Sequence, residues 1–287
     1  MTLVLGATGR LGRLVVDGLV AAGAGCRPVS RDPARAAALA RPGVEPVVLD
    51  VADADALERA LTGVDRLFLC LPTSREQAAL ERGVVDAAAR TGTPLVKLAW
   101  VGAGMETDVP FGVWHREIEE HLAGAGVPHT IVRSSSFVQH LWGELIAPRV
   151  REGGAFRLSA GDGRVAAVDL RDVADVCVRL LLAGEHEGRA LDLTGPEALS
   201  FAEAAAVVAA AADRPVAYVD APEEDVRAEL LALGHDAWFA AALIRLYRLY
   251  RADALAAVSP DLEAVLGRPG RRFAEWAREA RDLFVAP

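Results

Sequence analysis

A doubly wound parallel α/β sheet is the fold that this sequence predicts, and two observations predict it. In the first half of the chain, short apolar segments typical of strands alternate with amphipathic segments typical of helices. Residues 66–71, with the sequence RLFLCL, form a near-continuous apolar run, as expected for a strand buried on both faces of a parallel sheet. Ligands of such folds bind at the carboxyl ends of the strands.

The first half of the chain takes its elements in strict alternation. The expected strands are residues 3–5, 27–30, 44–50, 66–71, 95–99 and 129–133. The expected helices are residues 11–22, 33–40, 53–61, 74–90 and 111–123. Asp32 and Asp53 stand where two of these helices begin, and there a carboxylate accepts hydrogen bonds from free N–H groups.

The pattern loosens after about residue 148. The expected strands there are residues 155–158, 164–168, 191–193 and 216–219, and the expected helices are 171–183, 201–212, 222–233, 238–250 and 272–284. We expect residues 1–148 to form the sheet domain. We expect residues 149–287 to form a smaller lobe, with some interleaving of the chain, that binds the substrate over the carboxyl ends of the strands.

Composition narrows the class of protein. The chain has 287 residues, of which 52% are hydrophobic, and a net charge of −9 without a basic block, so a nucleic-acid partner is not expected. Short apolar runs broken by charges predict no membrane span, and a strand that starts near residue 2 predicts no signal peptide. Cys26, Cys70 and Cys177 are an odd, widely spaced set, read as buried thiols of a cytoplasmic protein without a metal site.

The first twelve residues predict a nucleotide site. A short strand leads into Gly6, Thr8, Gly9, Arg10, Leu11 and Gly12, with the spacing G-x-x-G-x-x-G. Backbone N–H groups at the following helix N-terminus point at a bound phosphate, and glycines allow its close approach. The alternative is a tight strand–helix connection without a ligand. We favour the nucleotide site, which makes residues 1–148 an NAD(P)-binding domain.

The residues after the second strand favour NADP(H). An acidic residue there binds the ribose 2′-hydroxyl of NAD, whereas arginine or serine suits the 2′-phosphate of NADP. Ser30 and Arg31 stand there, and Arg10 lies in the glycine turn. The alternatives are that both arginines are solvated, and that Asp32 binds a 2′-hydroxyl or caps a helix. Four further cofactor contacts are expected at the ends of the third and fourth strands: Asp50, Val51, Leu71 and Pro72.

Together these motifs resemble the NmrA-like branch of the atypical short-chain dehydrogenase/reductase superfamily. The resemblance rests on the segment 3–12, Arg31 and Asp50, and on three later motifs. The later motifs are Glu119 with Leu122 followed by 126–133 and Phe137, then Gly161-Asp-Gly, then Asp172-Val-Ala. Members include NADP-dependent quinone, ketone and imine reductases, and also redox-sensing regulators that bind the nucleotide without turning it over.

The resemblance also exposes a departure at the catalytic positions. Active reductases of the superfamily use a serine and Tyr-x-x-x-Lys, with a glutamate often four residues after the lysine. Taking Glu119 as that glutamate places His115 at the lysine position, Phe111 at the tyrosine position and Ala99 near the serine position. Phe111 donates no proton, whereas a histidine titrates near neutral pH.

Three proton sources therefore stay open. His115 is a ribose contact, a general acid or a structural residue; His140 is a second acid or a surface histidine. An acceptor with its own hydroxyl beside the carbonyl supplies the proton itself, as is thought for some polyketide reductases that lack Tyr and Lys. Ser134 and Ser136 follow the sixth strand, where the nicotinamide is expected.

The aromatic side chains predict a flat, apolar substrate. Core packing is the alternative for each of them. The aromatic residues near the expected nicotinamide are Trp100, Phe111, Trp114, Phe137, Trp142, Trp238, Phe239, Tyr247 and Tyr250. We expect an NADPH-dependent reductase of a carbonyl or quinone on a polycyclic aromatic molecule, acting as a monomer or homodimer. The alternatives are a non-catalytic NADP-binding regulator and, more weakly, an epimerase- or dehydratase-like enzyme.

Overall fold

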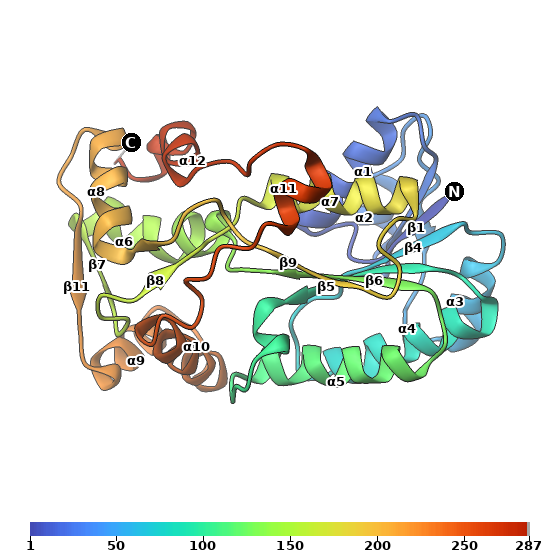
Figure 1. Cartoon of the computed structure of the whole chain (residues 1–287), viewed down its shortest axis with the longest axis horizontal. Helices are drawn as coiled ribbons and strands as arrows, with labels where there is room; N and C mark the ends of the chain where they lie inside the picture. Colours follow the sequence, from blue (N-terminus) through green and yellow to red (C-terminus); the bar gives the residue numbers. More distant parts are fainter. Residues whose placement is uncertain (286–287) are drawn as a thin grey trace.

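A seven-stranded parallel sheet forms the centre of the computed structural model, which describes residues 1–285 (Figure 1). Its strand order is β3-β2-β1-β4-β5-β6-β9. The strands are β1 (Thr2–Val4), β2 (Cys26–Ser30), β3 (Val47–Val48), β4 (Arg66–Leu69), β5 (Leu95–Trp100), β6 (His129–Ser134) and β9 (Ala190–Leu193). The doubly wound α/β fold is confirmed, and the order reverses between β1 and β4, where ligands of such folds bind.

Helices cover both faces of the sheet. On one face lie α1 (Arg10–Ala21), α7 (Leu170–Ala183) and α11 (Asp261–Leu266), with α2 (Pro33–Ala37) beside β2; on the other lie α3 (Ala54–Leu61), α4 (Gln77–Thr91) and α5 (Pro110–Gly124). Side chains alternate along each strand between two cores. Phe68 packs with α1 and α7, whereas Leu67 and Leu69 pack with α3 and α4. This double burial explains why the strands are apolar throughout.

The second lobe has an aromatic core. The Trp142 ring lies between 5.0 and 6.1 Å from the rings of Phe156, Phe201 and Phe273, measured between centroids. The lobe contains a π-helix η2 (Gln139–Ile146), α6 (Ala147–Gly153), β7 (Ala155–Leu158), β8 (Arg164–Val165), β10 (Leu199–Ser200), α8 (Phe201–Ala212), β11 (Ala217–Asp220), α9 (Glu223–Ala232), α10 (Ala237–Arg251), α12 (Phe273–Glu279) and a 3₁₀ turn η3 (Arg281–Leu283). Strands β7 and β11 pair in parallel, and β8 and β10 pair antiparallel.

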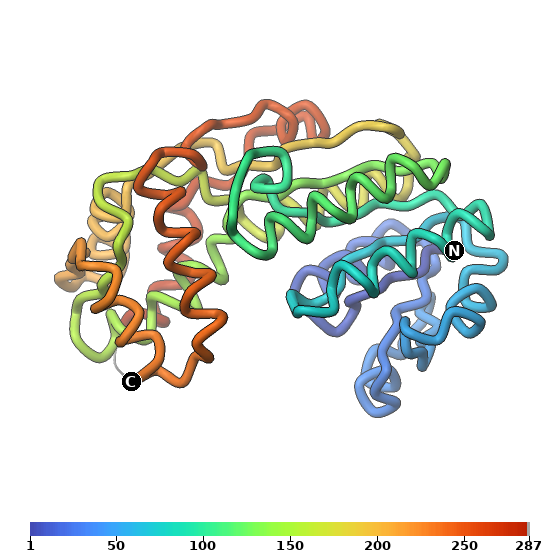
Figure 2. The backbone as a smooth tube through the Cα atoms, turned by 90° about the horizontal axis from the view of Figure 1, so that it is seen from below, coloured from blue at the N-terminus to red at the C-terminus, as the bar shows by residue number. Residues whose placement is uncertain are grey.

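The chain crosses between the two parts more than once. After β8 it returns to the main sheet as α7 and β9, and after α10 it returns as α11 (Figure 1). Figure 2 shows the second lobe beside the sheet domain, with α10 nearest to it among the orange segments. The strand expected at 191–193 therefore belongs to the main sheet, not to a sheet of the second lobe.

Some expected elements differ in length or were missed. The strand expected over 44–50 shrinks to Val47–Val48, and the helix expected over 74–90 begins at Gln77. Residues 139–153, for which no element was expected, are helical throughout. Pro148 near the start of α6 is compatible with the helix, because the first helical N–H groups have no intrahelical acceptor. The helix expected over 272–284 is α12 followed by η3.

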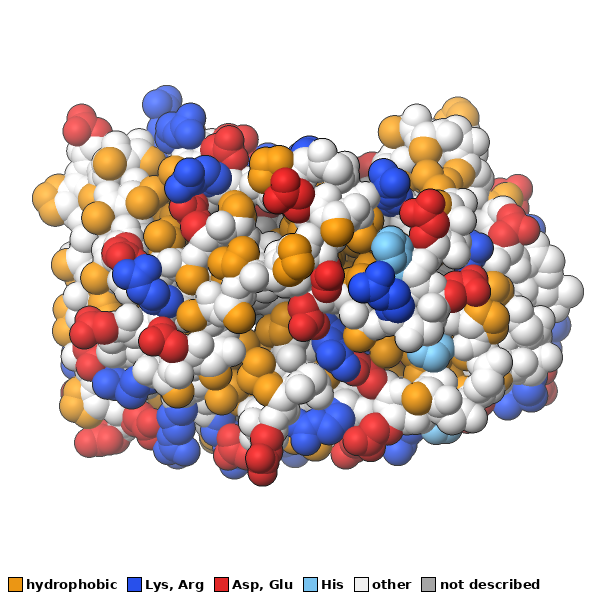
Figure 3. Space-filling view, in the orientation of Figure 1, with side chains coloured by type: hydrophobic (Ala, Val, Ile, Leu, Met, Phe, Trp, Pro, Cys, Tyr) orange, Lys and Arg blue, Asp and Glu red, His pale blue; other side chains and the backbone are white. Residues whose placement is uncertain are grey.

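The surface shown in Figure 3 has acidic and basic side chains intermixed. Within residues 1–285, no helix is long and apolar enough to cross a membrane. Over the same residues, no three His, Cys, Asp or Glu side chains are grouped as metal ligands.

Candidate active site

A cavity of about 450 Å³ lies at the carboxyl ends of β4, β5 and β6, and α10 and η2 of the second lobe close it. This is the place that the strand order predicts for a ligand. The side chains and backbone that line it are Cys70, Leu71, Pro72, Thr73, Gln77, Leu98, Ala99, Trp100, Phe111, His115, Ser134, Ser135, Ser136, Phe137, His140, Leu141, Leu145, Phe239, Leu243, Leu246, Tyr247 and Tyr250.

The glycine turn has the geometry of a phosphate cradle. Gly6 has φ +78°, and a Cβ on it would collide with the Cys70 carbonyl oxygen. A Cβ on Gly12 would collide with the Gly6 carbonyl oxygen, so both positions require glycine. Gly9 precedes α1, and no side chain of the described residues caps that helix. The N–H groups of Arg10, Leu11 and Gly12 in its first turn therefore lack intrahelical acceptors and fit a phosphate.

Leu11 anchors the start of α1 in the core, and Thr8 is half-buried beside it. Neither these residues nor the glycines line the cavity. The cavity thus corresponds to the far end of a dinucleotide and to the substrate, not to the phosphates.

Of the residues after β2, Asp32 caps a helix and Arg31 is exposed to solvent. The Asp32 N–H donates to Ser30 Oγ at 3.1 Å, and Asp32 Oδ1 accepts hydrogen bonds from the first N–H groups of α2. Asp32 is therefore a helix cap, which was one of its two expected roles. Arg31 is exposed, and no carboxylate among residues 1–285 pairs with it.

Arg10 and Asp50, unlike Arg31, have partners within the described residues. The Arg10 guanidinium forms an ion pair with Glu144 of η2. Asp50 Oδ1 accepts a hydrogen bond from the Ala52 N–H at 3.0 Å, while Val51 beside it is half-buried. Asp50 and Val51 lie outside the cavity, whereas Leu71 and Pro72 line it.

A buried charged network beneath the cavity is the main feature that sequence reasoning missed. Lys97 of β5 and Glu81 of α4 are fully buried, with Nζ 3.1 Å from Glu81 Oε2. Lys97 Nζ also donates to the Leu98 carbonyl oxygen at 2.8 Å and lies 3.0 Å from His115 Nδ1. Glu81 Oε1 accepts from the Leu71 N–H and from Gln77 Nε2, each at 3.2 Å. In the sequence, the one indication of this network is Lys97 itself, a lysine within the apolar strand 95–100.

This network fixes the form of His115. Lys97 Nζ–H donates to Nδ1, so Nε2 carries the ring hydrogen. Burial, and then the positive charge of Lys97, hold the pKa of His115 well below its usual range. The expectation that His115 donates a proton near neutral pH as an imidazolium is therefore wrong. His115 is neutral there, and Nε2–H is a hydrogen-bond donor at the cavity wall.

Phe111, Ala99 and Ser134 line the cavity. The Phe111 ring meets Trp100 edge to face, with centroids 5.0 Å apart. Ser134 Oγ donates to the Ala99 carbonyl oxygen at 3.3 Å. Phe111 and Ala99 therefore offer no hydroxyl to the cavity.

Ser136 and His140 differ in surroundings. Ser136 Oγ lies 2.7 Å from Tyr250 Oη at the cavity wall. His140 Nδ1 lies 2.8 Å from Glu144 Oε2, and the His140 side chain is 47% exposed. Burial, and then the positive charges of Arg10 and His235, lower the pKa of His140. A neutral, carboxylate-paired imidazole is a weak acid, which argues against the general-acid role considered for His140.

Three of the expected pocket aromatics do not line the cavity. Trp142 belongs to the core of the second lobe. Trp114 of α5 and Trp238 of α10 stack on each other instead, with centroids 5.4 Å apart and planes inclined by 11°. The Arg75 guanidinium lies 5.7 Å above the Trp238 ring, which adds a cation–π contact. These side chains join the two lobes beside the cavity.

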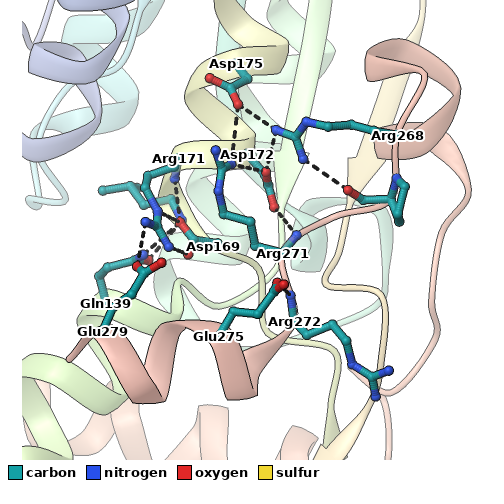
Figure 4. A network of polar contacts seen from close by, with 12 residues as sticks. Gln139, Asp169, Arg171, Asp172, Asp175, Arg268, Arg271, Arg272, Glu275 and Glu279 are labelled. Carbon is teal, nitrogen blue, oxygen red and sulfur yellow. Dashed lines mark hydrogen bonds and ion pairs between the residues drawn. The ribbon is translucent and has the colours of Figure 1, made fainter. Parts of the chain in front are cut away.

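Glu119 and Asp172, which belong to the motifs that carry the resemblance, lie outside the cavity and form ion pairs. Glu119 forms a bidentate pair with Arg133 of β6, with Oε2 at 2.6 Å from Nη2. Asp172 of α7 is 1% exposed and accepts from Arg268 Nη2 at 2.8 Å and from the Arg271 N–H at 2.6 Å (Figure 4). In the same cluster, Arg171 pairs with Asp169 (Figure 4). This cluster ties the C-terminal segment to the sheet domain.

Known proteins resemble this chain over its whole length. It is 36% identical to the NAD(P)H azoreductase of Xenophilus azovorans over 287 residues, which are 100% of both chains. It is 37% identical to a (4-alkanoyl-5-oxo-2,5-dihydrofuran-3-yl)methyl phosphate reductase of Streptomyces griseus, with 99% of each chain covered.

A solved structure agrees with these relatives. The NADPH-dependent quinone oxidoreductase of Escherichia coli, in complex with NADPH, superposes with a TM-score of 0.91 at 28% identity, over 97% of this chain and 99% of that one. A family model described as NAD(P)H-binding matches residues 6–183, which include the glycine turn and the strands around the cavity. This chain therefore belongs to the NAD(P)H-binding family.

Proposed function

We propose that this protein is an NADPH-dependent reductase that transfers hydride to a carbonyl or quinone of a flat, polycyclic aromatic molecule of polyketide-like shape. The observation that carries the proposal is the apolar, aromatic-walled cavity of about 450 Å³ at the carboxyl ends of β4, β5 and β6. The full-length relatives named as an azoreductase and a phosphate ester reductase support a reductase. Azo and quinone acceptors share the flat, conjugated shape that the cavity suits.

The residues of this chain divide the work of binding. The uncapped first turn of α1 binds the pyrophosphate, and Arg31 binds the 2′-phosphate. His115 Nε2–H and Ser134 hold the ribose and nicotinamide end, where Leu71 and Pro72 also line the cavity. Asp50 and Val51, outside the cavity, contact the adenosine side. Bound NADPH supplies the hydride. Trp100, Phe111 and Phe239 hold the acceptor in place by stacking and exclude water.

Proton supply is substrate-assisted in this proposal. An acceptor with a hydroxyl beside the reacting carbonyl donates an internal hydrogen bond to the oxygen as charge develops there. Phe111 cannot supply it, and the neutral His115 is a poor acid. Methylating that hydroxyl should therefore slow turnover sharply while binding is largely kept. Equal rates for the parent and the methylated acceptor would contradict substrate assistance alone.

A panel of acceptors tests the function. NADPH oxidation is followed by absorbance with quinones, polycyclic ketones and azo dyes, and NADPH binding is measured in parallel by calorimetry. We expect turnover of flat aromatic acceptors and none of aliphatic ketones of similar electrophilicity. NADPH binding without oxidation across the whole panel would replace the reductase by the alternative, a redox-sensing regulator.

A further inference from the structure

Two hydroxyl groups from different lobes meet at the cavity wall. Ser136 follows β6, and Tyr250 lies near the end of α10; Ser136 Oγ and Tyr250 Oη are 2.7 Å apart, and both residues line the cavity. Each hydroxyl carries one hydrogen and accepts as well as donates. Within residues 1–285, the bond between them is the one hydrogen bond that either makes. One O–H of the pair is therefore left to donate to a ligand, whichever of the two donates to the other.

The fold holds Tyr250 firmly in this place. Its side chain is 1% exposed and packs on Phe201 and Tyr247, with ring centroids 5.5 and 5.9 Å away. Gly163 lies so close to the Tyr250 backbone that a Cβ on it would collide with the Tyr250 carbonyl oxygen. The next residue, Arg251, donates from Nε to the Ser159 carbonyl oxygen at 3.0 Å. The Gly161-Asp-Gly motif thus lies in a turn that positions the end of α10.

We propose that the Ser136–Tyr250 pair binds the reacting oxygen of the acceptor, and that Tyr250 supplies from the second lobe the phenol that position 111 lacks. This inference rests on the proposed reductase function and names the residues that recognise its acceptor. Phe111 and Ala99, which also line the cavity, have no hydroxyl. A hydroxyl pair in a pocket walled mainly by apolar side chains is the arrangement that fixes the orientation of a ligand with one polar atom.

The pair acts as a hydrogen-bond donor, not as the source of the proton. As the carbonyl carbon gains the hydride and a C–H bond forms, the π electron pair of the C=O bond moves to the oxygen. The free O–H of the pair donates to that oxygen, and its partner hydroxyl polarises it through the 2.7 Å bond. Burial raises the pKa of the Tyr250 phenol, so the phenol keeps its proton. Where the acceptor has no hydroxyl beside the carbonyl, water then protonates the product oxygen to give the alcohol.

Single-hydroxyl deletions test the pair by kinetics. Tyr250→Phe and Ser136→Ala each remove one oxygen. The acceptor is tetralone, an aromatic ketone without a neighbouring hydroxyl. We expect kcat for tetralone to fall roughly a hundredfold in either variant, as when one oxyanion donor is lost. The double variant should be little slower than either single one, because the two hydroxyls act as a unit. The NADPH dissociation constant should not change.

Tyr218→Phe is the matched control, since Tyr218 packs on Phe156 in the second lobe and does not line the cavity. Tyr218→Phe should leave kcat for tetralone unchanged. Wild-type rates in Tyr250→Phe, or losses that simply multiply in the double variant, would overturn the proposal.

Ligand binding tests the pair without turnover. Naphthol and naphthalene share one shape and differ by one hydroxyl, so the ratio of their affinities reports on a partner for that oxygen. We expect wild-type protein to bind naphthol roughly fivefold more tightly, the range of one net hydrogen bond, and Tyr250→Phe to erase the difference. An unchanged ratio in Tyr250→Phe would contradict the pair. This result decides the inference even if the wild-type protein reduces no acceptor, an outcome that would refute the proposed function alone.

Discussion

Arg31 is the residue on which the choice of nucleotide depends most. It is exposed after β2 without a carboxylate partner in the described chain, whereas Asp32 beside it is occupied as a helix cap. A charge-assisted hydrogen bond contributes roughly 1.5–3 kcal/mol, so NADPH should bind tenfold or more tightly than NADH. Arg31→Ala should remove most of this preference, measured by calorimetric titration with both nucleotides.

Arg35→Ala is the control, because Arg35 lies on the same surface and pairs with Asp32. It should keep the preference for NADPH. Equal affinity of the wild-type protein for both nucleotides would contradict the assignment of Arg31.

His115 makes stability depend on pH in a direction that follows from its surroundings. Its pKa in the folded protein lies well below the value of about 6.5 that an unfolded chain has. Above about pH 6.5, His115 is neutral in both the folded and the unfolded state, so it does not lower the free energy of unfolding. As the pH falls below that value, the unfolded chain binds a proton that the folded protein refuses, so the free energy of unfolding decreases until the pH reaches the folded pKa.

His115→Gln should flatten this decrease, measured by urea denaturation at a series of pH values. His186→Gln, a change outside the Lys97 network, is the control. An identical slope in wild type and His115→Gln would contradict the neutral, buried imidazole. The pH profile of kcat/KM should likewise show no inflection from His115 near neutral pH.

At the scale of elements, the Lys97–Glu81 pair links β5 to α4 inside the core. Both side chains are at most 1% exposed. Removing one partner leaves an uncompensated buried charge, which costs about 3–5 kcal/mol. Lys97→Met should therefore lower the free energy of unfolding by that amount, as measured by chemical denaturation. Adding Glu81→Gln should recover most of the loss, because the amide oxygen still accepts from the Leu71 N–H.

The exposed pair Arg90–Glu58, between α4 and α3, provides the control. Arg90→Met should cost at most about 1 kcal/mol. Similar losses of unfolding free energy in Lys97→Met and Arg90→Met would contradict the prediction that breaking the buried pair costs more than breaking an exposed one.

The elements that sequence patterns predicted are those with a local signal. Helix α8 spans 201–212 as expected, and it begins there because Ser200 and Glu203 form a capping box. Helix α3 starts after Asp53 for a similar reason. The strand expected over 44–50 is mostly loop, since only Val47 and Val48 pair with β2 as a strand and Val44 forms an isolated bridge to Cys26. Residues 139–153 gave no clear helical period, because a π-helix does not follow the 3.6-residue repeat.

At the scale of the whole molecule, the site was only partly predictable. The glycine turn and the ends of β4, β5 and β6 follow from the order of elements along the chain. The contact between Ser136 and Tyr250 joins residues 114 positions apart, and that between Lys97 and Glu81 joins β5 to α4. No spacing rule brings such pairs together; they depend on how the second lobe and the helices pack against the sheet.

The interleaved chain makes the sheet domain depend on the second half of the sequence. A fragment of residues 1–148 lacks β9 and α7, whose buried side chains include Val173, Val176, Leu180, Leu191 and Leu193. Each such side chain contributes roughly 1.5–3 kcal/mol, so the loss is comparable with the about 5–15 kcal/mol that keeps a domain folded. The fragment should show no cooperative thermal transition by circular dichroism.

Co-expression with a separate chain of residues 149–287 should restore the transition and NADPH binding, because it returns β9 and α7 to the sheet. Cooperative unfolding and nucleotide binding by the fragment alone would contradict this dependence.

The stacked indoles of Trp114 and Trp238 give the molecule an optical signal of its own. One ring belongs to α5 of the sheet domain and the other to α10 of the second lobe, 5.4 Å apart and nearly parallel. Two chromophores this close share their excitation, which gives a paired positive and negative band in ultraviolet circular dichroism when their transition dipoles are inclined to each other within the stacked planes. The band vanishes when the rings separate, so its amplitude measures the gap between the lobes without any attached label. Nucleotide and acceptor can then be added in turn, and the opening and closing of the cavity read directly from the unmodified chain.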